Sequence, residues 1–558
     1  MNRVSAMAKQ KEQVIQLSEA TEDGKPAPFR FPVGYNYLLD FMGAWLLVFC
    51  GLMMLPGNAN PKHWGKTLQP KESESTGPDL KGLLPIERRE PPVKRRGEPI
   101  PPVRNGIQPP KHRKGTTPPP KFVDKDPRSH LRRYPIVVPT PRPRWYRRIK
   151  EKRKLGLRMP AIEVGSENTL RAFLHSMEDT QKKIATTRIT FYGDSMILQD
   201  YVVGPFRRFM QRRYGDSGHG YLTFSSPWTD YRYTHANVLH YWRGEWKVWG
   251  LIKPRIPGNR YGLNGFVFAA SEDREQPLPR TFFGSSTWGV GKQLTRTEIW
   301  FEKSRRGGSF DLWHRKVGAR KWIRERHSVK GADGELGSVK LDLEEGRYRF
   351  MVRPRSRKVR LYGIHLHRDK PGVIIDSAGV LGAVLLHTRA FDKKHWRKML
   401  KKAKTKLLMF FFGANDADLY RKLGSKKYRA ATRVVLQELH AMAKSVGASC
   451  LVLGPSTRGW KRGDDILPLR RVRKLRLLMH KEVLDAGCAF WDTMTAMGGP
   501  KAIQKWAAHE PALIATDFTH MSKIGSRILG RLVYNAVVNA INGRVRLVPK
   551  EKRGKLRY

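Results

Sequence analysis

The sequence predicts an α/β fold with a parallel sheet, interrupted by a β-rich insertion. Short apolar, β-branched runs alternate with stretches of helical periodicity before residue 222 and again after residue 372. Such alternation is typical of a parallel sheet covered by helices on both faces. Between them, residues 222–366 hold many short runs of alternating polar and apolar residues separated by glycine-rich turns. This second pattern predicts an antiparallel β-sandwich inserted into the first domain.

Residues 1–55 precede any of these patterns. A tail over residues 1–34 leads into an apolar segment over residues 35–55, which only Asp40 interrupts. A membrane-spanning helix needs about 20 apolar residues, so the segment predicts a single membrane anchor if Asp40 lies near the interface. Two alternatives remain, a signal peptide cleaved after Ala59 and a buried core helix.

A basic, proline-rich linker follows over residues 56–150. It holds 20 of the 37 prolines, and its 23 lysines and arginines against 8 acidic residues give a net charge of +15. This composition favours an extended chain that cannot build a core. We expect a solvated tether, which can also dock on an anionic polymer.

Helices and strands of the α/β part follow from hydrophobic periodicity. We expect one domain over residues 166–221 and 372–545, and a basic C-terminal tail over residues 546–558. The predicted strands are 187–192, 373–376, 406–412, 449–453 and 488–491, and the predicted helices are 167–183, 201–213, 383–401, 418–446, 468–486 and 522–540.

The chain has three scattered cysteines, at positions 50, 450 and 488. Their spacing matches neither a disulfide framework nor a zinc site. Cys450 and Cys488 lie in apolar runs, so we expect both to be small buried hydrophobic residues. The histidines also lack the spacing of a metal site, and we expect no metal and no cofactor.

A candidate nucleophile stands at the end of the strand predicted over residues 187–192. The strand runs into Gly193-Asp194-Ser195, and ligands of α/β sheets bind at the C-terminal ends of strands. A serine hydroxyl needs an adjacent base, itself oriented by a third group. Asp517 and His520 are three residues apart just before the last predicted helix, so the carboxylate can reach the imidazole.

An acyl-transfer site also needs donors directed at the developing oxyanion. Three candidates are the backbone N–H groups of Ser195 and Gly382 and the side-chain amide of Asn415. Each lies at or just beyond the C-terminal end of a predicted strand. A parallel sheet would gather them on one edge.

These four segments resemble the blocks of the SGNH (GDSL-like) hydrolases. They are Gly193-Asp194-Ser195, Gly382 in 379–383, Gly413-Ala414-Asn415-Asp416 and Asp517-Phe518-Thr519-His520, and they occur in the family's order. The resemblance implies a three-layer fold with Ser195 as nucleophile. It also implies His520 as base and then acid, Asp517 as its orienting group, and Gly382 and Asn415 in the oxyanion hole.

The insertion resembles one group within this family more than the others. It is similar to the sandwich carried by envelope esterases that act on O-acetylated peptidoglycan or related polysaccharides, and residues 213–221 resemble a glycine-rich stretch of the same proteins. Within that stretch Ser217 repeats the Gly-Asp-Ser tripeptide but follows a helix, so we do not expect it to be the nucleophile. We expect His219 to shape the cleft as a loop residue. Trp288 is our candidate for an exposed sugar-binding platform, and core packing is expected for most other tryptophans of the insertion.

Three functions remain open. The first is a serine esterase that removes O-acetyl groups from a cell-envelope polysaccharide, and the second is a polysaccharide O-acyltransferase with the same residues. The third is a non-catalytic polyanion-binding protein, motivated by the net charge of +58. No nucleic-acid motif is visible, so nucleic acid is not an expected partner. The expected partners are the polysaccharide substrate, an anionic envelope polymer held by the linker, and the inner membrane. The catalytic part would then be periplasmic, or secreted after signal cleavage.

Overall fold

The computed structural model describes residues 155–556 except 199, 227–237, 253 and 287–288. The expected tail, membrane segment and linker, and also Trp288, lie outside the described residues. Among the helices that are described, none combines the length and the apolar character that crossing a membrane requires.

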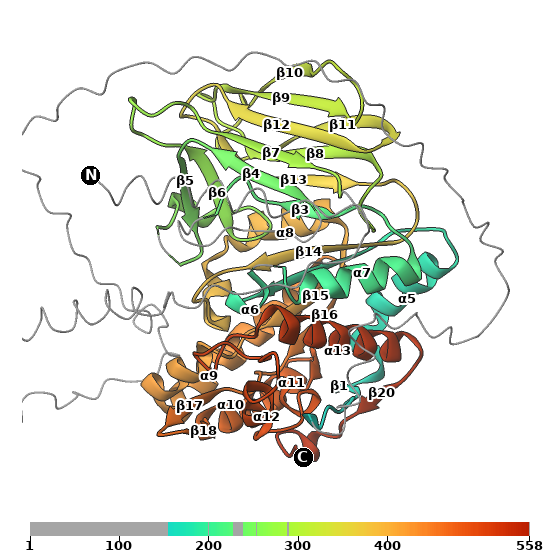
Figure 1. Ribbon diagram of the computed structural model, residues 1–558, viewed down its shortest axis with the longest axis vertical. Coiled ribbons are helices and arrows are strands. Elements are labelled where there is room, and N and C mark those ends of the chain that lie inside the picture. The colour runs from blue at the N-terminus through green and yellow to red at the C-terminus, as the bar shows by residue number, and fades with distance from the viewer. Residues whose placement is uncertain (1–154, 199, 227–237, 253, 287–288, 557–558) are drawn as a thin grey trace, which may run out of the picture. The chain divides into compact units, whose positions relative to one another are not determined.

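A seven-stranded sheet forms the centre of the α/β part (Figure 1). Its order is β14 (Val373–Gly379), β2 (Thr187–Gly193), β15 (Thr405–Phe411), β16 (Ser449–Leu453), β19 (Ala489–Trp491), β1 (Ile162–Val164) and β20 (Val545–Leu547). The first five strands are parallel, as predicted. β1 runs antiparallel to β19 and parallel to β20, so the sheet is mixed at one edge.

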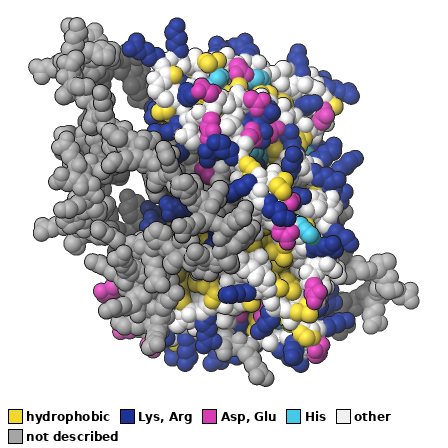
Figure 2. Space-filling model, turned by 90° about the vertical axis from the view of Figure 1, so that its right-hand side faces the viewer, with side chains coloured by type: hydrophobic (Ala, Val, Ile, Leu, Met, Phe, Trp, Pro, Cys, Tyr) yellow, Lys and Arg dark blue, Asp and Glu magenta, His cyan; other side chains and the backbone are white. Residues whose placement is uncertain are grey.

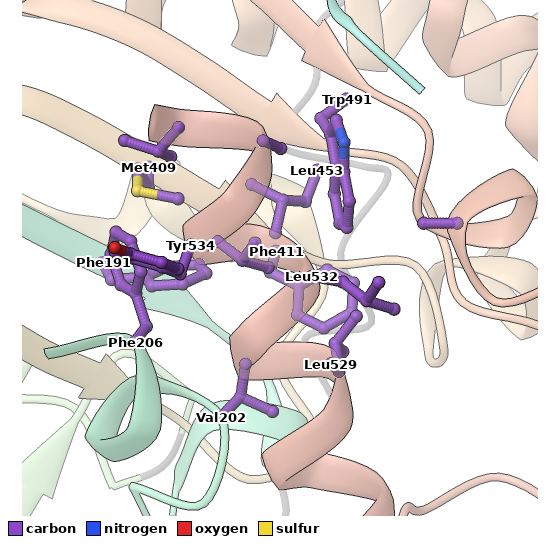
Figure 3. Close-up of a cluster of buried hydrophobic side chains, with 14 of the residues drawn as sticks. Phe191, Val202, Phe206, Met409, Phe411, Leu453, Trp491, Leu529, Leu532 and Tyr534 are labelled. Atoms are coloured by element: carbon purple, nitrogen blue, oxygen red, sulfur yellow. The ribbon is translucent and has the colours of Figure 1, made fainter. Parts of the chain in front are cut away.

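Helices cover both faces of this sheet. The side chains of β2 alternate, so that Phe191 faces α7 (Val203–Tyr214) and α13 (Lys523–Ile541), where it packs with Phe206 and Leu529 (Figure 3). On the other face the ring of Tyr192 contacts Trp396 of α8 (Lys393–Ala403). α9 (Asp416–Ser445) and α10 (Arg470–Asp485) complete that layer. Burial on both faces explains why the central strands are mostly apolar.

Two antiparallel sheets make up the insertion, as predicted. The first has the order β10 (Ile323–Ser328), β9 (Ser309–Lys316), β12 (Tyr348–Pro354), β7 (Arg280–Gly284) and β4 (Leu239–Arg243). The second has the order β11 (Leu336–Gly346), β8 (Leu294–Glu302), β13 (Arg360–His367), β6 (Phe266–Ala270) and β5 (Trp246–Gly250), with β3 (Gly220–Leu222) beside β13. Aromatic side chains join the two sheets, since the rings of Phe301 in β8 and Phe310 in β9 lie 5.7 Å apart.

Positive charge is spread over the molecule. Figure 2 shows lysine and arginine side chains across one face of the molecule, with acidic side chains among them. On this face the positive charge is therefore not concentrated in one region. Other charges are paired in the interior, for example Arg188 with Asp376 at 2.8 Å and Arg207 with Asp200 at 2.7 Å.

The expectation for two of the cysteines is wrong. Cys450 and Cys488 form a disulfide. Cys450 lies in β16 and Cys488 directly precedes β19, and these strands are neighbours in the sheet. The two cysteines are 38 positions apart with a helix between them, so the sequence does not show that they meet.

The domain limits also need correction. Residues 546–556 are no separate tail, because β20 extends the sheet beside β1 and Arg553 binds the carboxylate of Asp485 at 3.0 Å. The helix expected over residues 383–401 is broken into the short 3-10 helix η5 (Leu385–Ala390) and α8. The break has a local cause, since the carboxylate of Asp392 accepts a hydrogen bond from the backbone N–H of His395 and caps α8.

Candidate active site

Ser195 is the first residue of a short helix, α6 (Ser195–Leu198), directly after β2. The turn between them depends on Gly193. A Cβ at this position would lie 2.5 Å from the carbonyl oxygen of Phe411 in the neighbouring strand. The carboxylate of Asp194 accepts a hydrogen bond from the backbone N–H of Met196 at 2.9 Å. The strand, the glycine and this bond together place the hydroxyl of Ser195 at the C-terminal edge of the sheet.

The structure brings Ser195, His520 and Asp517 into one hydrogen-bonded chain. The hydroxyl Oγ of Ser195 lies 2.7 Å from Nε2 of His520. The other ring nitrogen, Nδ1, lies 2.5 Å from Oδ2 of Asp517. Serine and histidine are 325 residues apart in the sequence, so only the fold brings them together.

The loop that carries the acid and the base is fixed by its own backbone. The second carboxylate oxygen of Asp517, Oδ1, accepts hydrogen bonds from the backbone N–H groups of Thr519 and His520, each at 2.9 Å. α13 begins just after this loop, where the hydroxyl of Ser522 caps it by accepting from the N–H of Gly525. One oxygen of the carboxylate therefore holds the loop while the other holds the imidazole.

Electrostatics favour a base at His520. The hydrogen bond to Asp517 raises the pKa of the imidazole above its usual 6.5, against the opposing effect of partial burial. Burial acts to raise the pKa of Asp517, but the hydrogen bonds from His520 outweigh it and hold that pKa below 3.8. The carboxylate thus stays ionised while the imidazole takes up and releases a proton.

The predicted oxyanion donors lie on adjoining loops. β14 and β2 end side by side, and the N–H of Val380 donates to the carbonyl of Gly193 at 2.9 Å. The next turn holds Gly382 with a φ of +72°, which suits glycine. Asn415 reaches the same turn, since its Nδ2 donates to the carbonyl of Ala383 at 3.0 Å. Within the part of the chain that is described, the N–H groups of Ser195 and Gly382 have no acceptor.

A small cavity opens in front of the serine. Its volume is about 210 Å³. Ser195, Asp517 and His520 line it together with apolar side chains, which include Leu198, Leu381 and Met521. Pockets for drug-sized ligands are usually about 300–1,000 Å³, so this cavity has room for a short group only.

Two buried carboxyl groups lie behind this edge of the sheet. Neither was among the predicted site residues. Burial raises the pKa of Asp194 to about 7, although hydrogen bonds from the backbone lower it in part. Burial likewise raises the pKa of Asp416 to about 6, and its carboxylate accepts from the backbone of Leu385 and from the hydroxyl of Tyr428. The charge of Asp416 raises the pKa of Asp194, and the charge of Asp194 in turn raises the pKa of His520.

Arg458 is a further residue of the site that was not predicted from the sequence. Its guanidinium donates to the hydroxyl of Thr519 and to the carbonyl of Ala414, both at 2.9 Å, and to the carboxylate of Asp418 at 2.7 Å. It therefore ties the loop of Asp517 and His520 to the loop of Asn415. These contacts span 61 and 44 residues, so no local motif marks them.

The other candidates from the sequence lie away from the cavity. Ser217 is buried and its hydroxyl donates to the carbonyl of Lys370 at 2.6 Å. His219 is buried and does not line the cavity, contrary to the expectation that it shapes the cleft. Trp288 is outside the described residues. Among those described, no three histidine, cysteine or acidic side chains are placed to hold a metal ion.

Comparison with known proteins gives a match in structure but none in sequence. No family model matches the chain. Nor does any curated protein. A solved structure of a peptidoglycan O-acetylesterase matches with a TM-score of 0.54 at 15% identity, over 67% of this chain and 96% of that chain. An acetylxylan esterase from Geobacillus stearothermophilus (TM-score 0.23, 19% identity) covers 30% of this chain and 73% of its own length. The first match shows that the two chains share a fold.

Proposed function

We propose that this chain, which has the fold of that peptidoglycan O-acetylesterase, is a serine esterase that removes O-acetyl groups from a cell-envelope polysaccharide. The observation that carries the proposal is the chain of hydrogen bonds from Ser195 through His520 to Asp517 at the C-terminal edge of the sheet. A serine with a base at 2.7 Å and an orienting carboxylate behind it meets the requirements of nucleophilic acyl transfer.

In the first step the ester is transferred to the enzyme. Nε2 of His520 takes the proton from Ser195 as Oγ attacks the acetyl carbonyl carbon. The carbonyl oxygen becomes an oxyanion, and the N–H groups of Ser195 and Gly382 and the amide of Asn415 are the candidates to bind it. When the tetrahedral intermediate collapses, the C–O bond to the sugar breaks and His520 gives its proton to the leaving sugar oxygen.

In the second step water releases the acetyl group. His520 takes a proton from water, whose oxygen attacks the acyl-serine carbonyl carbon. The bond to Oγ then breaks, and Ser195 recovers its proton from His520. The sum is one ester and one water converted to a sugar hydroxyl and acetic acid, with the enzyme unchanged. The negative charge of Asp517 stabilises the imidazolium that forms in each step.

The size of the cavity supports a short acyl group. Its volume of about 210 Å³ and apolar lining by Leu198, Leu381 and Met521 suit a methyl or ethyl group beside the reacting carbonyl. We therefore expect kcat/KM to fall by about tenfold or more between acetyl and octanoyl esters of one alcohol. Equal rates for the two esters would contradict this assignment.

The polysaccharide substrate and the location are proposed on separate grounds. The fold is that of an enzyme described as a peptidoglycan O-acetylesterase. The disulfide between Cys450 and Cys488 supports an oxidising compartment such as the periplasm, because disulfides persist there and are rare in the cytosol. The apolar segment 35–55 would anchor the protein in the inner membrane, and the linker 56–150 would hold an anionic envelope polymer.

Two experiments test the function. Labelling of the intact protein with a serine-reactive fluorophosphonate, followed by peptide mapping, should place the label on Ser195 and on no other serine. Absence of the label from Ser195 would refute the nucleophile. Release of acetate from O-acetylated peptidoglycan by the wild type, but not by Ser195→Ala, then tests the substrate. Transfer of acetyl to an added glycan without free acetate would instead identify an O-acyltransferase.

A further inference from the structure

The five-stranded sheet of the insertion has an inner and an outer face. On its inner face, Phe283, Leu312 and Phe350 are at most 1% exposed, where they pack toward the second sheet. Alternate residues of the same strands point the other way. We call the surface made by these alternate residues of β4, β7, β9, β10 and β12 the outer face.

One row of side chains crosses the outer face from edge to edge. The strand register pairs each residue directly with the next, in the order Tyr241, Phe282, Met351, Trp313 and Arg324. Directly opposed residues of antiparallel strands have Cβ atoms about 4.5–5.5 Å apart, so the row is continuous. The rings of Tyr241 and Phe282 are stacked at 4.6 Å, and Tyr241 is 41% exposed. The row thus offers a flat aromatic surface at Tyr241 and Phe282, and a further aromatic ring, Trp313, follows beyond Met351.

Arginines surround this row. The outer face carries seven of them, and only one acidic side chain, Asp311, lies among them on these five strands. The arginines are Arg243, Arg280, Arg315, Arg324, Arg326, Arg349 and Arg353. Asp311 is fully buried, and Arg324 and Arg326 bind it at 2.7 and 3.0 Å. The accessible charge of the outer face is therefore positive.

Two of these arginines lie over aromatic rings. The guanidinium of Arg324 lies 5.2 Å from the ring centroid of Trp313, and that of Arg315 lies 5.0 Å from Trp322. These contacts hold planar donors beside planar apolar surfaces. A guanidinium can bind a carboxylate through two parallel hydrogen bonds, while an aromatic face can stack on the apolar face of a ring. A ligand that fits both is a polymer of rings that carry negative charge.

We propose that the outer face binds an anionic polysaccharide. The carboxylates of the polymer would bind the arginines, and its sugar rings would stack on the aromatic side chains of the row. This inference rests on the proposed function for its choice of a glycan over other polyanions. The linker of this chain is not a suitable occupant, because residues 56–150 carry a net charge of +15. Single-stranded nucleic acid combines rings with charge as well, and the experiment distinguishes it.

The test is hydroxyl-radical footprinting of the full chain carrying Ser195→Ala, which binds without turnover. The probes are polygalacturonate, its full methyl ester, which keeps the sugar backbone without the charge, and single-stranded DNA. We expect polygalacturonate to protect Tyr241, Met351 and Trp313 from oxidation at a concentration about tenfold or more below that of the methyl ester. Trp460, which is 45% exposed outside the insertion, is the control and should stay unprotected.

Paired variants separate this face from the general positive charge. Arg243→Gln with Arg349→Gln should raise the polygalacturonate concentration needed for half-protection about tenfold, because two ion contacts to the polymer are lost. Lys426→Gln with Lys427→Gln removes the same amount of charge from α9, and should change the concentration needed for half-protection less than twofold. No protection of the row, equal effects of the two pairs, or tighter protection by DNA would each overturn the proposal.

Failure here is distinguishable from failure of the proposed function. In the chain with an intact Ser195, the two arginine substitutions should leave hydrolysis of a small acetyl ester within about twofold of wild type. If the row is unprotected while the ester is hydrolysed, the esterase stands and the binding face does not. If the row is protected while the ester is not hydrolysed, the binding face stands and the esterase does not.

Discussion

Replacing Asp517 by asparagine tests how the site sets the tautomer of His520. Oδ1 of Asp517 accepts from two backbone N–H groups at 2.9 Å, while Oδ2 lies 2.5 Å from Nδ1 of the imidazole. In Asp517→Asn the amide oxygen will stay with the two N–H donors, because the flipped amide would leave both of them facing an NH₂ group. At about 1 kcal/mol for each donor, this preference is about 30-fold.

The amide NH₂ then faces Nδ1 of His520, which has to accept. The ring proton moves to Nε2, which can no longer accept the proton of Ser195. The charge that stabilises the imidazolium is also lost, which removes about 2 kcal/mol more. Together these effects predict a fall in kcat/KM of about 10³-fold or more on a small acetyl ester.

The control is Asp464→Asn, since Asp464 is exposed on a turn away from the site. Steady-state rates and thermal unfolding of both variants should be measured side by side. We expect the control to keep wild-type rates, and both variants to unfold within a few degrees of wild type. A loss below tenfold in a folded Asp517→Asn protein would refute the tautomer argument.

Three further predictions concern the same structure. First, kcat/KM should fall on the acidic side with a midpoint above pH 6.5, because only neutral His520 accepts a proton and its pKa is raised; a midpoint below 6.5 in a pH series contradicts this. Second, Cys450→Ser with Cys488→Ser should lower the free energy of unfolding by about 4 kcal/mol in urea titrations, since the disulfide closes a 38-residue separation; an unchanged value argues against the bond. Third, Arg458→Gln should lower kcat/KM about tenfold or more and move the acidic midpoint upward, because its charge lowers the pKa of His520. Arg458→Lys should restore the midpoint, and a rate loss without that pattern would mean a structural role alone.

The sequence predicts the strands of the central sheet that are apolar runs and misses the two that are not. Five of the predicted strands are mostly apolar runs, and the structure places them as β2, β14, β15, β16 and β19. β1 and β20 have three residues each, with a charged residue between two apolar ones, so neither stands out as an apolar run. They become strands because their neighbours in the sheet offer hydrogen-bond partners, and sequence patterns contain no information on that.

The residues of the candidate site divide in the same way, into those that short motifs mark and those that only the fold brings together. Gly193, Ser195, Asp517 and His520 belong to short motifs, and a motif can be read without knowing the fold. The functional roles of these residues stay predictions until they are measured. Arg458 gains its importance from partners in two distant loops, and the disulfide comes from strands that are adjacent only in space. Such pairings follow from topology and not from composition or spacing.

The two buried carboxyl groups behind the site stabilise the folded protein in a pH range that differs from the range in which the site is active. Asp194 and Asp416 have pKa values raised to about 7 and about 6. A carboxyl whose pKa is raised on folding stabilises the native state below its unfolded value, and this contribution is lost as the pH rises through the folded value. His520 becomes neutral, and able to act as a base, over the same range. These two carboxyl groups therefore stabilise the folded state most at a pH where His520 is protonated and cannot act as a base, and least at a pH where it can.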